Sequence, residues 1–392
     1  MRVMIIGPDG YLGFPLVQRL LERGHEVVGI DNLSRRRRVR EVGGWTAIPI
    51  SDPYERVEAI KDRWPDFTMR ITDVMDSDDV DYIFQKHHPD AVVHLGEIPS
   101  APYSMMDQKH CIETFNNNIN GTLNILHSIA KYAPECRQVK LGTMGEWGTP
   151  DCDIPEGEFE IDFRGRRVKL PFPKRPGSFY HLTKAADSLN IRFACDTWKL
   201  SCTDIMQGVV HGTGIKEMED DPRLRTRFDF DECFGTAINR FCAQAVIEHP
   251  LTPYGKGGQT RGYIALRDSI QCMAILVENP PDEGEYRVLN QLDECYDVYS
   301  LALKVQEIAR EFDLNPPIAK VENPRIEAEE HYYNPDTAKL KALGFKPTFT
   351  LEEELRITIP ALLEYKDRIE AKRERIMPRT KWERPRAEDR DI

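Results

Sequence analysis

"VMIIGPDGYLG", residues 3–13, is the stretch that decides the fold of this 392-residue chain. An apolar run at 3–6 leads directly into glycines at 7, 10 and 13, and "FPLVQRLLER" (14–23) then reads as a helix. In such a strand–loop–helix unit, glycines let the backbone approach a pyrophosphate at the helix N-terminus. We therefore expect a dinucleotide to contact this loop, at Gly7, Asp9, Gly10, Tyr11, Leu12 and Gly13.

Strands and helices alternate through the N-terminal half. Apolar runs predict strands at 3–6, 26–31, 68–73, 90–97, 137–143 and 201–210, and helices are predicted at 14–23, 77–87, 117–132 and around Tyr180. Alternation of this kind builds βαβ units. The sequence predicts an α/β fold, with a Rossmann-type doubly wound parallel sheet over residues 1–210 and a hairpin insertion at about 151–178. We expect this hairpin to close over the site.

Beyond residue 211, strands and helices alternate less regularly. Helices are predicted at 233–248, 299–312 and 351–365, and a strand at 285–291. We expect a smaller C-terminal α/β substrate-binding domain over 211–365, with about 262–295 returning to the Rossmann domain. Residues 366–392 form a charged tail, and the last dozen have the composition of a disordered segment.

Composition argues against several functional classes. The net charge of −12 is unsuited to general nucleic-acid binding, and no apolar window is long enough to span a bilayer. The 9 cysteines form no CxxC pair, and there is no HExxH or clustered Cys/His spacing, so we expect reduced thiols and no metal. Because no leader-like segment precedes the first strand, we expect a cytoplasmic protein with no membrane or nucleic-acid partner.

The residues after the second and third strands bear on the choice of cofactor. Asp31 ends the second strand, where a carboxylate binds ribose hydroxyls and repels a 2′-phosphate, which favours NAD over NADP. The run Arg35–Arg38 keeps NADP open as an alternative, although a solvated basic loop or stacking on adenine would also explain it. Asp73 could contact the adenine amino group or simply carry charge at a helix N-terminus.

A redox constellation is suggested by "LGTMGE" (141–146) and "GSFYHLTKAAD" (177–187). Tyr180 and Lys184 lie four residues apart, on one face of a helix. An unperturbed tyrosine is a weak base, but a nearby ammonium and the positive ring of the cofactor would favour its phenolate. Thr143 could hold the same substrate hydroxyl. A solvated pair on a helix surface is the alternative, and the glycine loop, Asp31 and Thr143 favour catalysis.

Longer stretches extend this pattern over nearly the whole chain. They are "DNLSRR" (31–36), "SAPYSM" (100–105), "NNNINGTLN" (116–124), "KLGTMGEWGTP" (140–150), "QGVVHG" (207–212), "FGTAINRFC" (234–242), "YGKGGQTRGY" (254–263) and "NPRIEAEEHYYN" (323–334). On these residues the chain resembles the extended short-chain dehydrogenase/reductase superfamily, in its nucleotide-sugar-modifying branch that forms sulfonated sugars. The version is similar to prokaryotic or archaeal members.

The resemblance implies an activity and its partners. Members hold NAD tightly, oxidise C4 of UDP-glucose, lose the C6 hydroxyl after C5 deprotonation, add sulfite at C6 and return hydride to C4. Sulfite would arrive free or from a delivering protein, and the product would enter sulfolipid or glycan biosynthesis. Two alternatives are a 4-epimerase or dehydratase without a sulfite step, and a non-catalytic NAD sensor. Apolar faces on the helix after Asn117 and on the Tyr180 helix imply a homodimer or homotetramer.

The resemblance also implies roles for individual residues. Glu146 and His181 are candidates for the elimination step, and Met144 stands where related dehydratases carry an acidic residue; a capping glutamate and a packed histidine are the alternatives. Pro99 replaces an arginine that contacts substrate in the plant-type enzyme. Further cofactor contacts would be Asn32, Arg35, Arg36, Val74, Leu95, Gly96, Glu97, Asn117, Tyr180, Lys184 and Gln207. Substrate contacts would be Ser100, Tyr103, Thr143, Gln207, Thr236, Asn239, Arg240, Tyr254, Gln259, Thr260, Arg261, Arg325 and Glu327.

Overall fold

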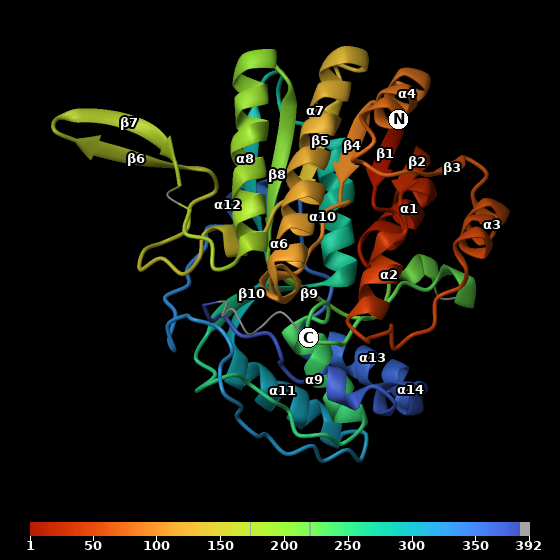
Figure 1. Ribbon diagram of the computed structural model, residues 1–392, viewed down its shortest axis with the longest axis vertical. Coiled ribbons are helices and arrows are strands. Elements are labelled where there is room, and N and C mark those ends of the chain that lie inside the picture. Colours follow the sequence, from red (N-terminus) through yellow and green to blue (C-terminus); the bar gives the residue numbers. More distant parts are fainter. Residues whose placement is uncertain (173, 219–220, 385–392) are drawn as a thin grey trace.

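A large parallel sheet forms the centre of the molecule. The computed structural model describes residues 1–172, 174–218 and 221–384. The sheet strands are β1 (Arg2–Ile6), β2 (Glu26–Asp31), β3 (Phe67–Ile71), β4 (Ala91–His94), β5 (Arg137–Leu141), β8 (Ser201–Gln207) and β11 (Tyr286–Gln291). They make a 7-stranded sheet of order β11-β8-β5-β4-β1-β2-β3, in which all neighbours are parallel (Figure 1). The predicted Rossmann-type fold class is confirmed.

Helices cover both faces of this sheet. They are α1 (Gly13–Glu22), α2 (Ser34–Glu41), α3 (Pro53–Arg63), α4 (Ser77–His87), α5 (Ala101–Met105), α6 (Gln108–Phe115), a π-helical turn (Asn116–Asn120), α7 (Gly121–Tyr132), α8 (Phe179–Trp198) and α10 (Leu266–Glu278). Successive side chains of a strand point to opposite faces. Val3 and Ile5 therefore join a core with α1 and α10, whereas Met4 and Ile6 join one with α4, α7 and α8.

The smaller half contains a three-stranded sheet and its own core. β10 (Thr260–Ala265) pairs in parallel with β9 (Val209–His211) and antiparallel with β12 (Glu294–Asp297). Ile238, Val305 and Leu355 belong to the core. The helices of this half are α9 (Ala237–Val246), α11 (Val298–Arg310), α13 (Leu351–Leu363) and α14 (Lys366–Glu370). The short helix α12 (Ala338–Ala342) instead packs against β11, and its Leu340 joins the core of the large sheet. Along the whole chain, 3₁₀ turns occur at Met144–Glu146, Lys216–Met218, Pro222–Leu224 and Arg373–Arg375.

The strand predicted at 201–210 is broken at Gly208 into β8 and β9. A Cβ at this position would lie 2.7 Å from the Gly262 carbonyl oxygen, so the chain can pass from the large sheet to the small one only at a glycine. The two halves consequently meet at the carboxyl ends of the parallel strands.

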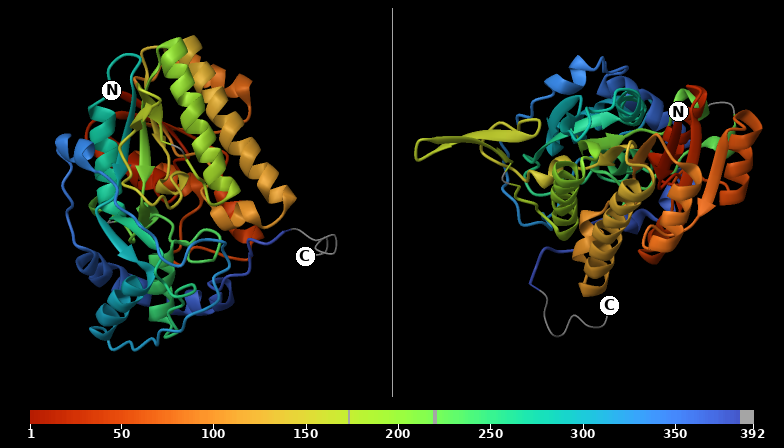
Figure 2. Two further views of the ribbon diagram at one scale, coloured as in Figure 1. Left: turned by 90° about the vertical axis from the view of Figure 1, so that its left-hand side faces the viewer. Right: turned by 90° about the horizontal axis from the view of Figure 1, so that it is seen from above.

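The hairpin and the tail differ from their predicted roles. β6 (Glu158–Phe163) and β7 (Arg166–Pro171) form an antiparallel hairpin that reaches away from the body (Figures 1 and 2). In the tail, residues 366–384 fold onto the body and Trp382 is buried, although residues 381–384 were expected to be disordered. Residues 385–392 lie outside the described residues.

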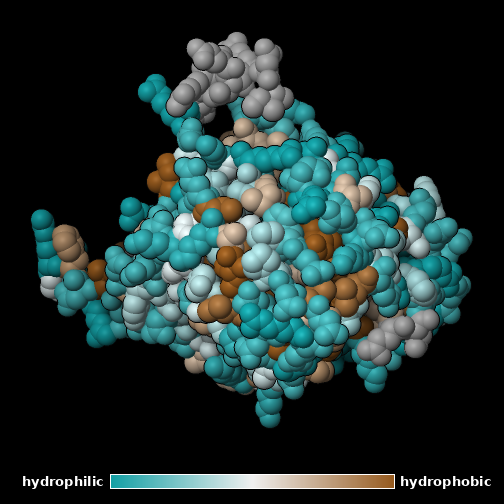
Figure 3. Space-filling model, turned by 90° about the horizontal axis from the view of Figure 1, so that it is seen from below, coloured by the Kyte–Doolittle hydropathy of each residue, from teal (hydrophilic) through white to brown (hydrophobic). Residues whose placement is uncertain are grey.

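The surface agrees with the acidic, hydrophilic composition. Seen from below, hydrophilic residues cover most of the visible face, and apolar residues appear in scattered patches (Figure 3). Within the described ranges, no helix is both long and apolar enough to cross a membrane.

Candidate active site

A cavity of about 780 Å³ opens where the strands of the large sheet end. Ligands bind at this edge of a doubly wound sheet, where the order of strands reverses. Most predicted site residues line the cavity: Gly7, Gly10, Tyr11, Leu12, Gly13, Asp31, Asn32, Arg35, Val74, Leu95, Gly96, Glu97, Ser100, Thr143, Met144, Tyr180, His181, Lys184, Gln207, Thr236, Arg240, Tyr254, Gln259, Arg261, Arg325 and Glu327. Residues far apart in sequence thus share one site.

The remaining predicted residues do not line the cavity: Asp9, Arg36, Asp73, Tyr103, Asn117, Glu146, Asn239 and Thr260. Tyr103 is fully buried, and its hydroxyl donates to Glu113 (2.9 Å), away from the cavity. The Asn239 side chain accepts the Gly212 amide (3.2 Å). Both residues support the wall, which corrects the expectation that they contact substrate.

Glycines shape a cradle between β1 and α1. Gly7 has a φ of +90°, and a Cβ there would lie 2.9 Å from the Leu95 carbonyl. A Cβ at Gly13 would lie 2.0 Å from the Gly7 carbonyl oxygen, so the loop can adopt this shape only with glycine at both positions. Bare backbone therefore faces the cavity at the N-terminus of α1, and this fits a pyrophosphate.

Asp31 lies at the ribose end of this cradle. Its carboxylate accepts the backbone amides of Asp9 (2.9 Å) and Leu33 (2.7 Å), which fix its orientation. Burial, and then the charge of Asp9, raise the pKa of Asp31 to about 6. Each oxygen already accepts one backbone amide and has room for a second donor, which a ribose hydroxyl would supply.

The run Arg35–Arg38 belongs to helix α2, not to a solvated loop. Arg36 donates twice to Asp9 (2.6 and 2.8 Å), and Arg35 pairs with Asp229 (2.8 Å). Carboxylates of the protein pair with both guanidinium groups, although Nη1 of Arg35 has no hydrogen-bond partner among the described residues. A 2′-phosphate at Arg35 would have to share it with Asp229, so this pairing, together with Asp31, favours NAD.

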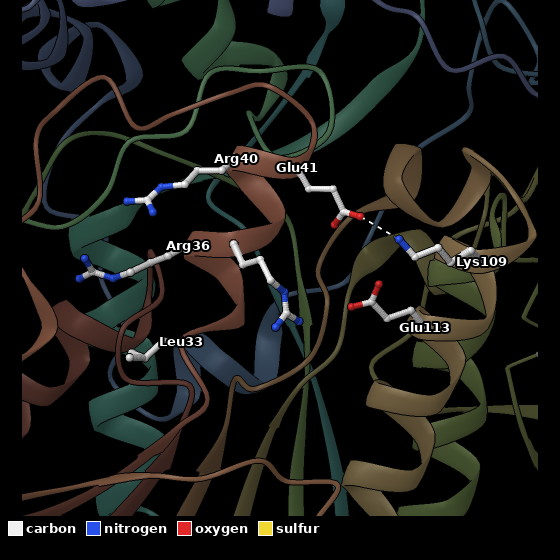
Figure 4. A pocket seen from close by; sticks show the side chains of 7 residues that line it. Leu33, Arg36, Arg40, Glu41, Lys109 and Glu113 are labelled. Carbon is white, nitrogen blue, oxygen red and sulfur yellow. Dashed lines mark hydrogen bonds and ion pairs between the residues drawn. The ribbon is translucent and has the colours of Figure 1, made fainter. Parts of the chain in front are cut away.

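The outer side of α2 borders a separate surface hollow of about 830 Å³ (Figure 4). Glu41 pairs with Lys109 of α6 at 3.1 Å, while Arg36 and Arg40 extend away from that pair. No residue lines both this hollow and the main cavity. The hollow is therefore not part of the dinucleotide site.

The π-helical turn at Asn116–Asn120 positions the segment after β4. Asn117 donates to the Gly96 carbonyl (3.1 Å), and Asn118 accepts the Ile98 amide (2.8 Å) and donates to Thr183 (2.9 Å). Turns of this kind often occur at functional sites. Here the widened turn ties the cavity wall after β4 to the helix that carries Tyr180.

The predicted redox residues meet at the edge of the sheet. Ser178 caps α8 by accepting the His181 amide (3.2 Å), which places Tyr180 in the first turn. Thr143 follows β5, and its side chain lies close enough to Tyr180 to favour the phenolate. The Lys184 ammonium lies 6.0 Å from the centre of the Tyr180 ring.

Glu97 changes the expected electrostatics of this group. Its carboxylate lies 2.6 Å from the Lys184 ammonium, and both side chains are buried. Burial first, and then Glu97 and Glu146, raise the pKa of Tyr180. In the protein by itself, the pKa of Tyr180 is therefore raised rather than lowered, and Glu97 lies against the ammonium that was expected to lower it.

Glu146 is a buried structural anion behind Thr143. Burial alone would raise its pKa, but Lys140 and Lys174 lower it to about 2. Oε1 of Glu146 lies 3.2 Å from the Lys140 ammonium and accepts the Thr143 amide at 3.3 Å. Oε2 lies 2.6 Å from the Lys174 ammonium. Glu146 therefore corresponds to the alternative of a capping glutamate, since it does not reach the cavity.

His181 and Met144 do face the cavity. The Nδ1 of His181 lies 3.0 Å from the Ser178 hydroxyl, and burial, followed by Arg325 and Arg261, lowers its pKa to about 3. The imidazole is therefore neutral at physiological pH, and its surroundings in the unliganded protein disfavour the protonated form. A Cβ at Gly145 would lie 2.3 Å from His181 Nε2, so the glycine leaves room for the ring.

Cationic residues gather at the opposite end, in the smaller half. Arg261 pairs with Glu327 (2.9 Å), and Arg240 donates to the Tyr254 hydroxyl (2.8 Å). Arg325 lines the same part of the cavity. Charged guanidinium groups of this kind suit a diphosphate.

Two features of the cavity differ from the sequence-based expectation. No residue of 158–171 lines it, so the prediction that the hairpin closes the site is wrong; the base of the hairpin pairs with α8 through Glu158 and Arg192, and its strands run outward. Trp382 lines the cavity and was missed, because nothing in a polar tail marks one tryptophan as returning to the site. Among the described residues, no cluster of His, Cys, Asp or Glu suits a metal ion.

Comparisons with known proteins identify the family of the chain. Residues 3–290 match the NAD dependent epimerase/dehydratase family. The chain is 48% identical over 387 residues to UDP-sulfoquinovose synthase of Sulfolobus acidocaldarius, with 98% of each chain covered. It is 44% identical over 388 residues to the chloroplastic UDP-sulfoquinovose synthase of Spinacia oleracea, covering 98% of this chain and 79% of that protein.

Solved structures support the fold. The UDP-glucose 4-epimerase of Thermus thermophilus, in complex with NAD, has a TM-score of 0.66 at 22% identity and covers 92% of this chain and 99% of its own. The UDP-glucuronic acid 4-epimerase of Bacillus cereus, with UDP-glucuronic acid and NAD, has a TM-score of 0.68 at 19% identity and covers 93% and 99%. At these identities the likeness concerns the fold alone.

Proposed function

The chain belongs to the NAD dependent epimerase/dehydratase family, and we propose that it acts as a UDP-sulfoquinovose synthase on UDP-glucose and sulfite. Similarity to two such synthases over 98% of the chain carries this proposal. The cavity supports it, because it joins a dinucleotide cradle, a Tyr–Thr–Lys group and a cationic end. Residues 1–210 would hold the cofactor, and residues 211–365 most of the nucleotide sugar.

NAD is the cofactor of this family, and when bound it accepts a hydride from the C4 carbon and later returns it. The residues of the chain control the accompanying protons. Thr143 holds the C4 hydroxyl, and Tyr180 takes its proton. The positive cofactor ring adds to the charge of Lys184 and favours the Tyr180 phenolate, which Glu97 otherwise opposes.

The elimination and addition steps fall to residues on the Tyr180 side of the cavity. A ketone at C4 acidifies the C5 proton, and His181, which lines the cavity beside Tyr180, would remove it once a bound diphosphate offsets the charges of Arg325 and Arg261. The C6–O bond then breaks, and His181 passes this proton to the departing hydroxyl, which leaves as water. Bisulfite forms the C–S bond at C6 and supplies the proton that C5 takes up. Buried Glu146 positions Thr143 without exchanging protons with the sugar.

Three arginines would bind the nucleotide. Arg240, Arg261 and Arg325 converge where the diphosphate would lie, and Gln259 is buried beside them with neither side-chain oxygen nor nitrogen bonded within the described chain. An unpartnered amide in a cavity wall suits a polar ligand such as uracil.

Labelled sulfite tests the proposal directly. Purified protein, UDP-glucose and ³⁴S-sulfite should give a nucleotide sugar with the mass of UDP-sulfoquinovose that carries the label. Omitting sulfite should abolish that product. Release of UDP-galactose, or of a stable 4-keto-6-deoxy sugar, would instead assign an epimerase or a dehydratase. Adding a sulfite-delivering protein would show whether free sulfite is the efficient donor.

We also propose that two copies of the chain pair through α7 and α8, which run side by side (Figure 2). α8 exposes an apolar stripe with helical spacing: Phe179, Leu182, Leu189 and Phe193, which are 45%, 42%, 54% and 62% exposed. Such a stripe is typical of a helical interface. Light scattering should give at least a dimer for the native chain and a monomer for Phe193→Glu.

A further inference from the structure

The C-terminal residues 377–384, here called the strap, border the cavity. The strap lies in the deep-blue part of the chain in Figure 1. Its side chains alternate: Thr380 and Trp382 are buried, whereas Lys381 and Glu383 are exposed. One face of the strap is therefore built to lie against the protein.

Hydrogen bonds hold the strap to three segments around the cavity. The Thr380 amide donates to Glu232 (2.8 Å), which lines the cavity. The Trp382 amide donates to the Pro324 carbonyl (2.8 Å), and its indole N–H donates to the Gly177 carbonyl (2.9 Å). The strap thereby connects the base of the Tyr180 helix with the loop that carries Arg325.

The Trp382 ring lies between two predicted site residues. It packs in one apolar cluster with Tyr180 and Ala101, and Met105 lies against that cluster. The Arg325 guanidinium lies 5.3 Å from the ring centre. Within the described chain, the Arg325 side chain has no hydrogen bond and no ion pair, and its guanidinium lies over the indole.

We propose that Trp382 is a positioning residue of the nucleotide-sugar site, which orients Arg325 toward the diphosphate and completes the wall beside Tyr180. The proposal rests on the proposed function, which assigns Arg325 to the diphosphate. A cation held against an aromatic face keeps its charge and its N–H groups available for an anion. A tail that only added stability would not need to face the cavity.

Binding of UDP to the NAD-loaded protein tests this role without requiring turnover. By calorimetry, Trp382→Leu should bind UDP about fivefold more weakly than the native chain, because it keeps apolar volume but loses the aromatic face. Trp382→Phe should stay within about twofold, and Lys381→Ala, on the exposed side of the strap, should not change. The bound NAD content should be equal in all four proteins.

Two results would overturn the proposal: native UDP affinity in Trp382→Leu, or an equal loss in Trp382→Phe. Absence of UDP binding to the native chain would overturn it as well. If Trp382→Leu does not load NAD, tryptophan fluorescence provides a second test. Adding UDP should change the emission of the native chain but not that of Trp382→Phe. Equal responses of the two proteins would contradict the positioning role of Trp382. Failure to form a sulfonated product would refute the proposed function, but it would not affect the comparison of UDP affinities among the Trp382 variants.

Discussion

Arginines flank the cavity at both ends, and the two groups differ in whether carboxylates of the chain neutralise them. At the β2 end, every guanidinium of the group pairs with an aspartate of the chain: Arg35, Arg36 and Arg56. At the other end, the described residues supply a carboxylate to one member, Arg261, of the group Arg240, Arg261 and Arg325.

This difference separates scaffold from ligand site. A buried ion pair has already lost its hydration, and breaking it to bind a phosphate would leave an uncompensated charge. A guanidinium without a carboxylate can form charge-assisted hydrogen bonds to an incoming diphosphate. Proximity to the cavity therefore does not by itself identify a binding arginine. Arg240 and Arg325, which lack a carboxylate partner among the described residues, are the clearest candidates, and Arg261 shares its charge with Glu327.

Neither group of arginines performs the chemistry, so the largest effect should come from Tyr180 between them. Tyr180→Phe should lower kcat by about 10²–10⁴-fold, the usual contribution of a general base. Bound NAD should remain, because only the hydroxyl is lost. Product formation is the measurement, and Tyr54→Phe, at a tyrosine that is 74% exposed, is the control. A Tyr180→Phe variant with native turnover would remove Tyr180 as the base.

Removing a paired arginine should chiefly reduce stability. Arg56 is 1% exposed, pairs with Asp9 and lies over the Phe14 ring, so Arg56→Met should lower the free energy of unfolding by about 3 kcal/mol. Denaturant unfolding measures the loss. Arg261→Met, the matched variant of the other group, should unfold close to the native midpoint; equal losses in both would break the comparison.

Removing an arginine of the second group should chiefly reduce nucleotide affinity. Arg261→Met should weaken UDP binding by about 10–100-fold, since a charged hydrogen bond contributes about 1.5–3 kcal/mol. NAD occupancy should not change. Calorimetry with UDP measures this affinity. An unchanged value would show that Arg261 only forms an ion pair with Glu327 and does not bind the nucleotide.

Glu97→Gln should shift the pH dependence of turnover. The Glu97 charge raises the pKa of Tyr180, with Glu146 acting in the same direction and Lys140 and Thr143 opposing. Removing it lowers the pKa of the base, so a larger fraction is deprotonated at a given pH. The acid limb of the kcat/KM profile should move to lower pH. A shift to higher pH, or none, would contradict the role of Glu97.

The smallest effect is expected at Arg37, which belongs to the same basic run but is exposed. Arg37→Ala should change the free energy of unfolding by less than about 0.5 kcal/mol, as is usual for surface substitutions. NAD affinity should also stay native. A clear loss of NAD would show that the outer face of α2 takes part in binding.

Most residues predicted from the sequence line one cavity, because local patterns report on backbone geometry. The glycine loop requires close backbone approach at Gly7 and Gly13, and the glycine spacing in the sequence is enough to predict this approach. The Tyr180–Lys184 spacing places both residues on one helix face in any context. Reasoning failed where a role depends on distant partners: Tyr103 faces Glu113, and Glu146 faces Lys140 and Lys174, which leaves neither in the cavity.

The sequence by itself determined the alternating fold, the glycine cradle and the order of the redox residues, since these follow from periodicity and from conformations that only glycine adopts. Tertiary structure alone decided which charges are neutralised. Glu97 meets Lys184, and Asp9 meets Arg36, across segments that no local pattern connects. It also brought Trp382 back from the tail to Tyr180. Coulombic and packing energies depend on distance in space, which a linear sequence does not specify.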